Sequence, residues 1–155
     1  MINQVLSSED KILLDQRVSG TWSLNSKTGL IDVNGHIFLM NLKLISIPFK
    51  FWKVSGDFYC EGNQLTSLEG SPQIVGSFYC FDNQLTSLVG CPEIVEYFYC
   101  KGNKIKSFEY MPECNNQSEV IRDIRRQIRQ YLIDLGFDPK DKENFKKLMR
   151  AQERS

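Results

Sequence analysis

The stretch "NQLTSLEGSP" spans Asn63 to Pro72, and "NQLTSLVGCP" spans Asn83 to Pro92. The two stretches begin twenty residues apart and are identical at eight of ten positions. Longer segments align at the same period without gaps: "FYCEGNQLTSLEGSPQIVGS" (58–77), "FYCFDNQLTSLVGCPEIVEY" (78–97) and "FYCKGNKIKSFEYMPEC" (98–114). A fixed period of this length predicts a repeat protein, in which each unit buries its apolar side against its neighbours.

Each unit carries the pattern apolar-x-apolar-x-x-Asn-x-apolar-x-x-apolar, which the first unit fills with Phe58, Cys60, Asn63, Leu65 and Leu68. The alternation at its start predicts a short strand, because successive side chains of a strand point to opposite faces. Strands from successive units would then stack as a parallel sheet. We expect two interior columns, one of phenylalanines and one of cysteines: Phe58, Phe78 and Phe98, and Cys60, Cys80 and Cys100.

The recurring spacing also predicts where the chain turns after each strand. An Asn follows each strand at the same place, and its side-chain amide can bond backbone groups of the turn and of the neighbouring unit. The residue before the Asn favours turn geometry in each unit. A proline then stiffens the return path. These residues are Asn63, Asn83 and Asn103, Gly62, Asp82 and Gly102, and Pro72, Pro92 and Pro112.

These motifs resemble the leucine-rich repeat, in the short 20-residue form of bacterial effector proteins and of repeat proteins encoded by phages. The resemblance covers residues 38–114. It implies an α/β repeat, a short solenoid with parallel strands on its concave face. It also implies a phage or bacterial protein of the cytoplasm that binds a host protein and modulates or inhibits it. The repeat is a scaffold, so the resemblance implies no enzymatic activity.

The flanking residues predict caps that cover the ends of the stack. Residues 1–37 read as an N-terminal cap, with a helix capped by Ser7 or Ser8 and then a hairpin. Residues 38–57 fit the repeat loosely, after a one-residue slip. Residues 115–155 read as a helical cap, with one helix following Ser118 and ending at Gly136 and a short second helix.

Composition limits the classes of function. The chain has 155 residues, and its 19 basic residues balance its 19 acidic residues. The balance is uneven, because residues 54–115 carry three Lys and eight Asp or Glu, whereas residues 116–155 carry ten Lys or Arg and seven Asp or Glu. The first residues, "MINQVLSSED", do not resemble a signal peptide. No segment has the apolar length of a membrane helix.

Residues with reactive side chains do not form a catalytic pattern. The five cysteines are odd in number, and three recur at one unit position, which argues against a disulfide framework. Their spacing differs from that of zinc sites, so we interpret them as buried apolar residues rather than metal ligands. His36 is the only histidine, and we interpret it as a surface residue. We expect no enzymatic activity, cofactor or metal.

The outward positions of the predicted strands are rich in aromatic residues. Tyrosines occupy one row, which we expect Leu39 to precede. Tyrosine suits protein-binding hot spots because it offers a large area and few rotors. We expect another protein to bind here, although stacked rows can also merely stabilise a sheet, or a terminal segment can cover them. The candidate partner-binding residues are Tyr59, Glu61, Tyr79, Phe81, Tyr97, Tyr99 and Lys101.

The predicted helix after Ser118 offers a second surface. At about 100° per residue, four arginines fall on one side, opposite an apolar side that can cap the stack: Arg122, Arg125, Arg126 and Arg129. The alternative function is therefore that of a nucleic-acid-binding accessory protein, although no aromatic residues alternate with the arginines. A third possibility is an oligomerising structural protein. Partner and oligomeric state do not follow from the sequence.

Overall fold

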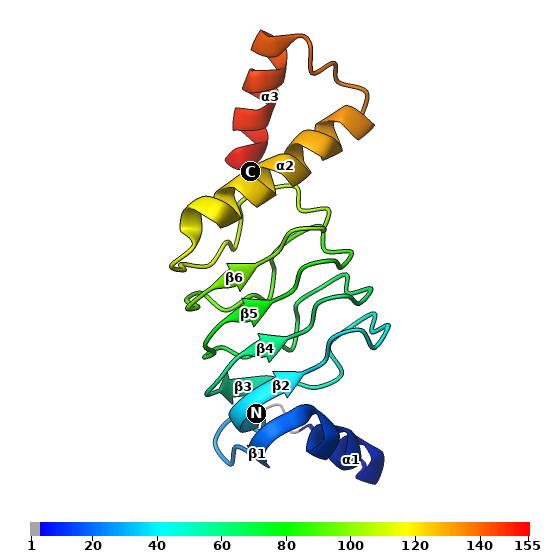
Figure 1. Cartoon of the computed structure of the whole chain (residues 1–155), viewed down its shortest axis with the longest axis vertical. Helices are drawn as coiled ribbons and strands as arrows, with labels where there is room; N and C mark the ends of the chain where they lie inside the picture. The colour runs from blue at the N-terminus through cyan, green and yellow to red at the C-terminus, as the bar shows by residue number, and fades with distance from the viewer. Residues whose placement is uncertain (1–3) are drawn as a thin grey trace.

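The computed structural model describes residues 4–155 as a mixed α/β fold, with a six-stranded sheet, one helix before it and two helices after it. Five strands follow one another in the order β1-β2-β4-β5-β6, and β3 also pairs with β2. The sheet runs along the long axis of the molecule, with α1 near one end and α2 and α3 at the other (Figure 1). Residues 1–3 of the predicted N-terminal cap lie outside the described residues.

The N-terminal part contains the predicted helix and hairpin. Helix α1 (Ser8–Arg17) begins after Ser7, whose side chain accepts the Asp10 N–H while Asp10 bonds back to the Ser7 N–H. This reciprocal pair is a capping box, which satisfies two free donors at the helix start. Strands β1 (Val18–Leu24) and β2 (Ile31–Phe38) then pair antiparallel. Strand β3 (Phe51–Val54) runs parallel to β2.

The three aligned segments each contribute a two-residue strand, β4 (Phe58–Tyr59), β5 (Phe78–Tyr79) and β6 (Phe98–Tyr99). These strands are parallel and in register at twenty residues. The predicted phenylalanine column is present, because the rings of Phe58 and Phe78 stack at 5.1 Å between centroids and those of Phe78 and Phe98 at 6.0 Å. The predicted cysteine column is equally buried.

The asparagines join each segment to the one before it, as the spacing predicts. Asn83 accepts the Leu65 N–H at 3.0 Å and donates to the carbonyl oxygens of Cys60 and Cys80 at 3.0 and 3.1 Å. Asn103 repeats these bonds one segment later. It accepts the Leu85 N–H and donates to the carbonyl oxygens of Cys80 and Cys100. One amide therefore satisfies buried backbone groups in two segments at once.

The turn before each asparagine has the left-handed backbone that its residues predict. Gly62 and Gly102 have φ values of 66° and 67°, and Asp82 takes the same conformation at 53°. Glycine has no steric penalty in this region, and Asp is among the few other residues that tolerate it. The same turn geometry is thus kept although the residue type changes.

The expected place of Leu39 in the tyrosine row is wrong by one residue. Ile37 pairs with Phe58 and Phe38 with Tyr59, so Phe38 holds that place and Leu39 is fully buried. The distance along the chain from Ile37 to Phe58 is 21 residues rather than 20. The following turn is also unlike the later ones, because both Asn41 and Lys43 have positive φ values, 56° and 58°.

Two helices cover the C-terminal end of the sheet (Figure 1). Helix α2 (Gln117–Asp134) begins one residue before Ser118 and packs Val120, Ile124, Ile128 and Leu132 into the core. Gly136, with a φ of 92°, follows its end as predicted. Helix α3 (Lys142–Glu153) is capped by Asp141 and packs against α2, with Phe145 buried.

Side-chain amides of the helical part form hydrogen bonds to backbone groups of the last segment. In the earlier segments, the next segment along the chain makes such bonds. Asn116 accepts the Phe98 N–H at 3.0 Å and donates to the Phe98 carbonyl oxygen at 2.8 Å, which pairs the free edge of β6. Gln127 accepts the Ile105 N–H at 2.9 Å and donates to the Cys100 carbonyl oxygen at 3.0 Å. These four backbone groups of the last segment are therefore satisfied without another strand.

Across residues 4–155, no helix combines the length and the apolar character that crossing a bilayer requires.

Candidate functional site

The predicted tyrosine row extends further than the sequence pattern indicates. Tyr59 and Tyr79 stack at 4.6 Å between ring centroids, and Tyr79 and Tyr99 at 4.9 Å. The rings of Phe38 and Tyr59 stack with 5.1 Å between their centroids, and the ring centroids of His36 and Phe38 lie 6.2 Å apart. All five rings are half-buried. We call these five residues the aromatic row. The one-residue shift before Phe58 hid Phe38 and His36 from the repeat alignment.

The stacking decides which part of each ring reaches solvent. Within the row, ring planes are nearly parallel, with interplanar angles of 8° and 12° along the three tyrosines. Each internal ring face is thus covered by its neighbour, so the row presents mainly ring edges and hydroxyl groups. Aromatic edges carry partial positive charge, and hydroxyls both donate and accept hydrogen bonds. A contacting surface with acceptor atoms or carbonyl groups fits such a row better than a cation placed over a ring.

Two further rows flank the tyrosines and hold the other predicted site residues. On one side lie Glu61, Phe81 and Lys101, with the Lys101 Nζ 5.9 Å from the Phe81 ring centroid. On the other side, Tyr97 is 40% exposed. The seven candidate residues therefore all reach the surface to some extent. We call them, with the aromatic row, the tyrosine face.

Asp57 organises the N-terminal end of the tyrosine face. Its Oδ1 accepts the Ser77 N–H at 2.7 Å, and its Oδ2 accepts the Tyr59 hydroxyl at 3.2 Å. Burial and then the Asp57 charge raise the pKa of Tyr59 to about 12, which keeps the phenol protonated as a donor.

His36 belongs to the same cluster and is half-buried, rather than an isolated surface residue. Its Nδ1 accepts the Asp57 N–H at 3.0 Å and lies 3.5 Å from the Asp57 Oδ2. An Nδ1 that accepts this bond leaves Nε2 as the donor of a neutral imidazole. The residue thus fixes the backbone at Asp57 from within β2, a role that its place in the sequence did not predict.

Glu61 is the least satisfied charged group of the tyrosine face. Its Oε2 is shielded from water and has no hydrogen-bond partner among residues 4–155. Burial raises the pKa of its carboxyl group. A carboxylate in this state gains from any donor or cation that a bound partner would bring to it.

The buried cysteines have no reactive environment. Cys60, Cys80 and Cys100 are at most 1% exposed. Burial raises the pKa of Cys60 and Cys80 well above the usual thiol range and that of Cys100 to about 12. In the part of the chain that the structure describes, no three His, Cys, Asp or Glu side chains are grouped to hold a metal ion.

The four arginines of α2 do not form one free surface. The Arg125 Nε lies 2.9 Å from the Glu153 Oε1 of α3, and the Arg129 guanidinium lies 5.6 Å from the Phe145 ring centroid. Arg126 lies 3.6 Å from Asp123 within α2. All four remain exposed, but α3 engages two of them.

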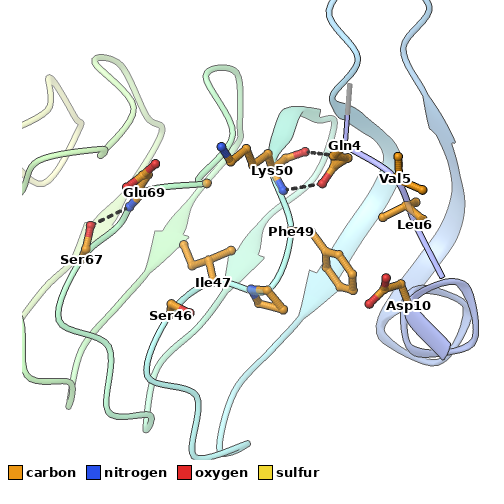
Figure 2. A pocket seen from close by; sticks show the side chains of 12 residues that line it. Gln4, Val5, Leu6, Asp10, Ser46, Ile47, Phe49, Lys50, Ser67 and Glu69 are labelled. Carbon is orange, nitrogen blue, oxygen red and sulfur yellow. Dashed lines mark hydrogen bonds between the residues drawn. The ribbon is translucent and has the colours of Figure 1, made fainter. Parts of the chain in front are cut away.

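Two hollows lie away from the tyrosine face. One, of about 480 Å³, separates the N-terminal segment from the loop before β3. There the Gln4 amide pairs with both backbone groups of Lys50, at 2.7 and 3.0 Å, and Phe49 points toward the segment that carries Leu6 (Figure 2). The other, of about 500 Å³, lies between α2 and the turn of the last segment. Neither has a signature in the spacing of the sequence, because each joins distant parts of the chain.

No protein-family model matches the chain, and no curated protein or solved structure shows significant similarity to it. A function is therefore inferred from the geometry of the surface and from the repeat motifs.

Proposed function

We propose that the chain is a short leucine-rich-repeat solenoid that binds another protein through the tyrosine face and has no enzymatic activity of its own. The observation that carries the proposal is the aromatic row, five half-buried rings side by side on one face of the sheet. Central aromatic side chains dominate the energy of many protein interfaces. In this proposal the short strands form the concave side of the solenoid.

Beside the aromatic row, whose edges and hydroxyl groups suit acceptor atoms, the charge of the segments favours basic or donor groups on the partner. Residues 54–100 contain six Asp or Glu and no Lys or Arg. Two of these acids, Asp57 and Glu61, lie beside Tyr59, and one Glu61 oxygen lacks a partner. Complementary charge speeds association and selects between partners, even where it adds little affinity.

From the likeness to bacterial and phage repeats, we also propose that the partner lies inside a bacterial cell, where binding would modulate or inhibit it. The alternative, nucleic-acid binding through the arginines of α2, is less well supported because Glu153 and Phe145 of α3 engage two of the four.

The test compares two double variants of the tagged full chain in capture from a bacterial lysate, followed by calorimetry with the purified partner. Phe81→Ala with Tyr97→Ala removes two aromatics of the face that are not stacked in the row. Each truncation can cost about 2 kcal/mol or more at an interface centre. Because 1.4 kcal/mol is a tenfold change in Kd, we expect the double variant to bind more than about 100-fold more weakly than the parent.

The matched control is Ile74→Ala with Ile94→Ala. These side chains are 51% and 67% exposed and lie outside the six strands of the sheet. The control should bind like the parent. Equal binding by the face variant and the parent, or loss in both double variants, would contradict the proposal. Binding that is lost with Arg122→Gln and falls steeply with salt would favour nucleic acid instead.

A further inference from the structure

The hollow between α2 and the last aligned segment has a chemistry of its own. One wall is the turn from Gly102 to Lys106, and the other is the side of α2 that carries Arg126, Gln130 and Tyr131. Its volume of about 500 Å³ lies within the range of small-molecule sites. It forms because Gln127 anchors the helix to this segment at two backbone groups.

Positive charge gathers in the hollow although the preceding chain is acidic. The first basic residues after Lys53 are Lys101, Lys104 and Lys106, and the last two line the hollow together with Arg126. Neither lining lysine has a carboxylate within 4.0 Å among residues 4–155, and Arg126, whose side chain is 72% exposed, has only a 3.6 Å contact with Asp123. Clustered cations with no tight ion pair attract an anion.

The other residues that line the hollow favour a ligand that carries a ring or hydroxyl groups in addition to an anionic group. Lys106 lies with its Nζ 4.7 Å from the Tyr131 ring centroid, so the ring borders the cationic part. Asp134 lines the hollow as well, and its Oδ1 accepts from Gln130 at 2.8 Å. Its other oxygen can accept from a hydroxyl group, as carboxylates in sugar-binding sites do.

We propose that this hollow binds a sugar phosphate, either free or within a mononucleotide. Lys104, Lys106 and Arg126 hold the phosphate, Asp134 accepts from a sugar hydroxyl, and Tyr131 offers a base the part of its ring that Lys106 does not cover. The site is independent of the tyrosine face and of the function proposed for it.

The test titrates the full chain with AMP, ribose 5-phosphate and inorganic phosphate, and follows backbone amide NMR signals and calorimetry. We expect saturable shifts at Gly102–Lys106 and along α2 near Tyr131 with AMP and ribose 5-phosphate. The variant Lys104→Gln with Lys106→Gln should weaken both about tenfold or more, because charge-assisted bonds to phosphate are lost. If the natural ligand is a mononucleotide whose base contacts the ring, Tyr131→Leu should weaken the binding of AMP but not that of ribose 5-phosphate. If the natural ligand is a free sugar phosphate, this variant should weaken the binding of neither compound.

The matched control, Lys27→Gln with Lys140→Gln, removes the same charge from exposed positions that do not line the hollow. It should bind like the parent. Thermal unfolding of each variant checks that the fold is kept. The proposal is overturned if AMP and ribose 5-phosphate cause no saturable shift up to about 10 mM. Equal loss in the control pair, or binding of inorganic phosphate or single-stranded RNA without binding of either small ligand, would also overturn it.

Discussion

Gln127 accepts the Ile105 N–H and donates to the Cys100 carbonyl oxygen, so this helical residue makes the bonds that Asn103 makes to Leu85 and Cys80 one segment earlier. A glutamine on a helix thus takes the place of the next asparagine. Together with Asn116 at Phe98, it pairs four backbone groups at the edge where the segments end.

This relationship predicts that Gln127→Ala destabilises the fold by about 1–3 kcal/mol, because the Ile105 N–H loses its partner and the Cys100 carbonyl oxygen keeps only its bond from Asn103. Chemical denaturation measures the change. Gln130→Ala is the control, since its side chain bonds only to Asp134 on the exposed side of the same helix. If the two variants unfold at the same midpoint, Gln127 does not anchor the helix.

The phenylalanine column predicts a larger effect in the core. Phe78 is fully buried between Phe58 and Phe98, so Phe78→Ala should cost about 3–5 kcal/mol. Phe137→Ala, at a position 38% exposed, is the comparison and should cost far less. Denaturation midpoints decide between them, and a Phe78 variant as stable as the parent would refute the predicted interior column.

The core columns and the asparagine bonds could be predicted from the sequence because each depends on local chemistry that recurs at a fixed spacing. Asn83 and Asn103 make the same bonds one segment apart, so one unit explains the other. Phe38 escaped prediction because the first stretch contains one additional residue, which shifts the register. A single residue more or less changes the face of every following side chain in a strand.

The caps and hollows could be predicted only in outline. The apolar spacing of α2 predicts a helix and its buried side, but not that Asn116 and Gln127 replace a strand. Side-chain amides on a helix surface have no periodic signature, and their partners lie 18 and 22 residues away along the chain. Likewise, His36 and Asp57 meet only because β2 and β4 are neighbours.

Burial of the cysteine column predicts a strict order of thiol reactivity. The thiolate is the reactive form, and burial keeps Cys60, Cys80 and Cys100 protonated by raising their pKa values. Cys114 is half-buried and should react first with a maleimide in the native state. Mass spectrometry of labelled peptides measures the order. In denaturant the five rates should converge, and native labelling of Cys60 as fast as Cys114 would contradict the buried column.

The burial of Glu61 predicts that replacing this residue makes the fold more stable but weakens binding to a basic partner. Because burial raises the pKa of Glu61 in the folded state, ionisation of this group costs stability as pH rises through that pKa. Glu61→Gln removes this cost, so the variant should be more stable than the parent at pH 7, and the gain should shrink as pH falls and Glu61 becomes protonated. Thermal unfolding between about pH 4 and 8 measures the difference. Glu69→Gln, at an exposed position of the same segment, is the control and should show no such pH-dependent gain.

If Glu61 serves to meet a basic partner, the stabilised variant should also bind that partner more weakly. A variant that is less stable at pH 7 would show that the Glu61 carboxylate is satisfied in the folded chain.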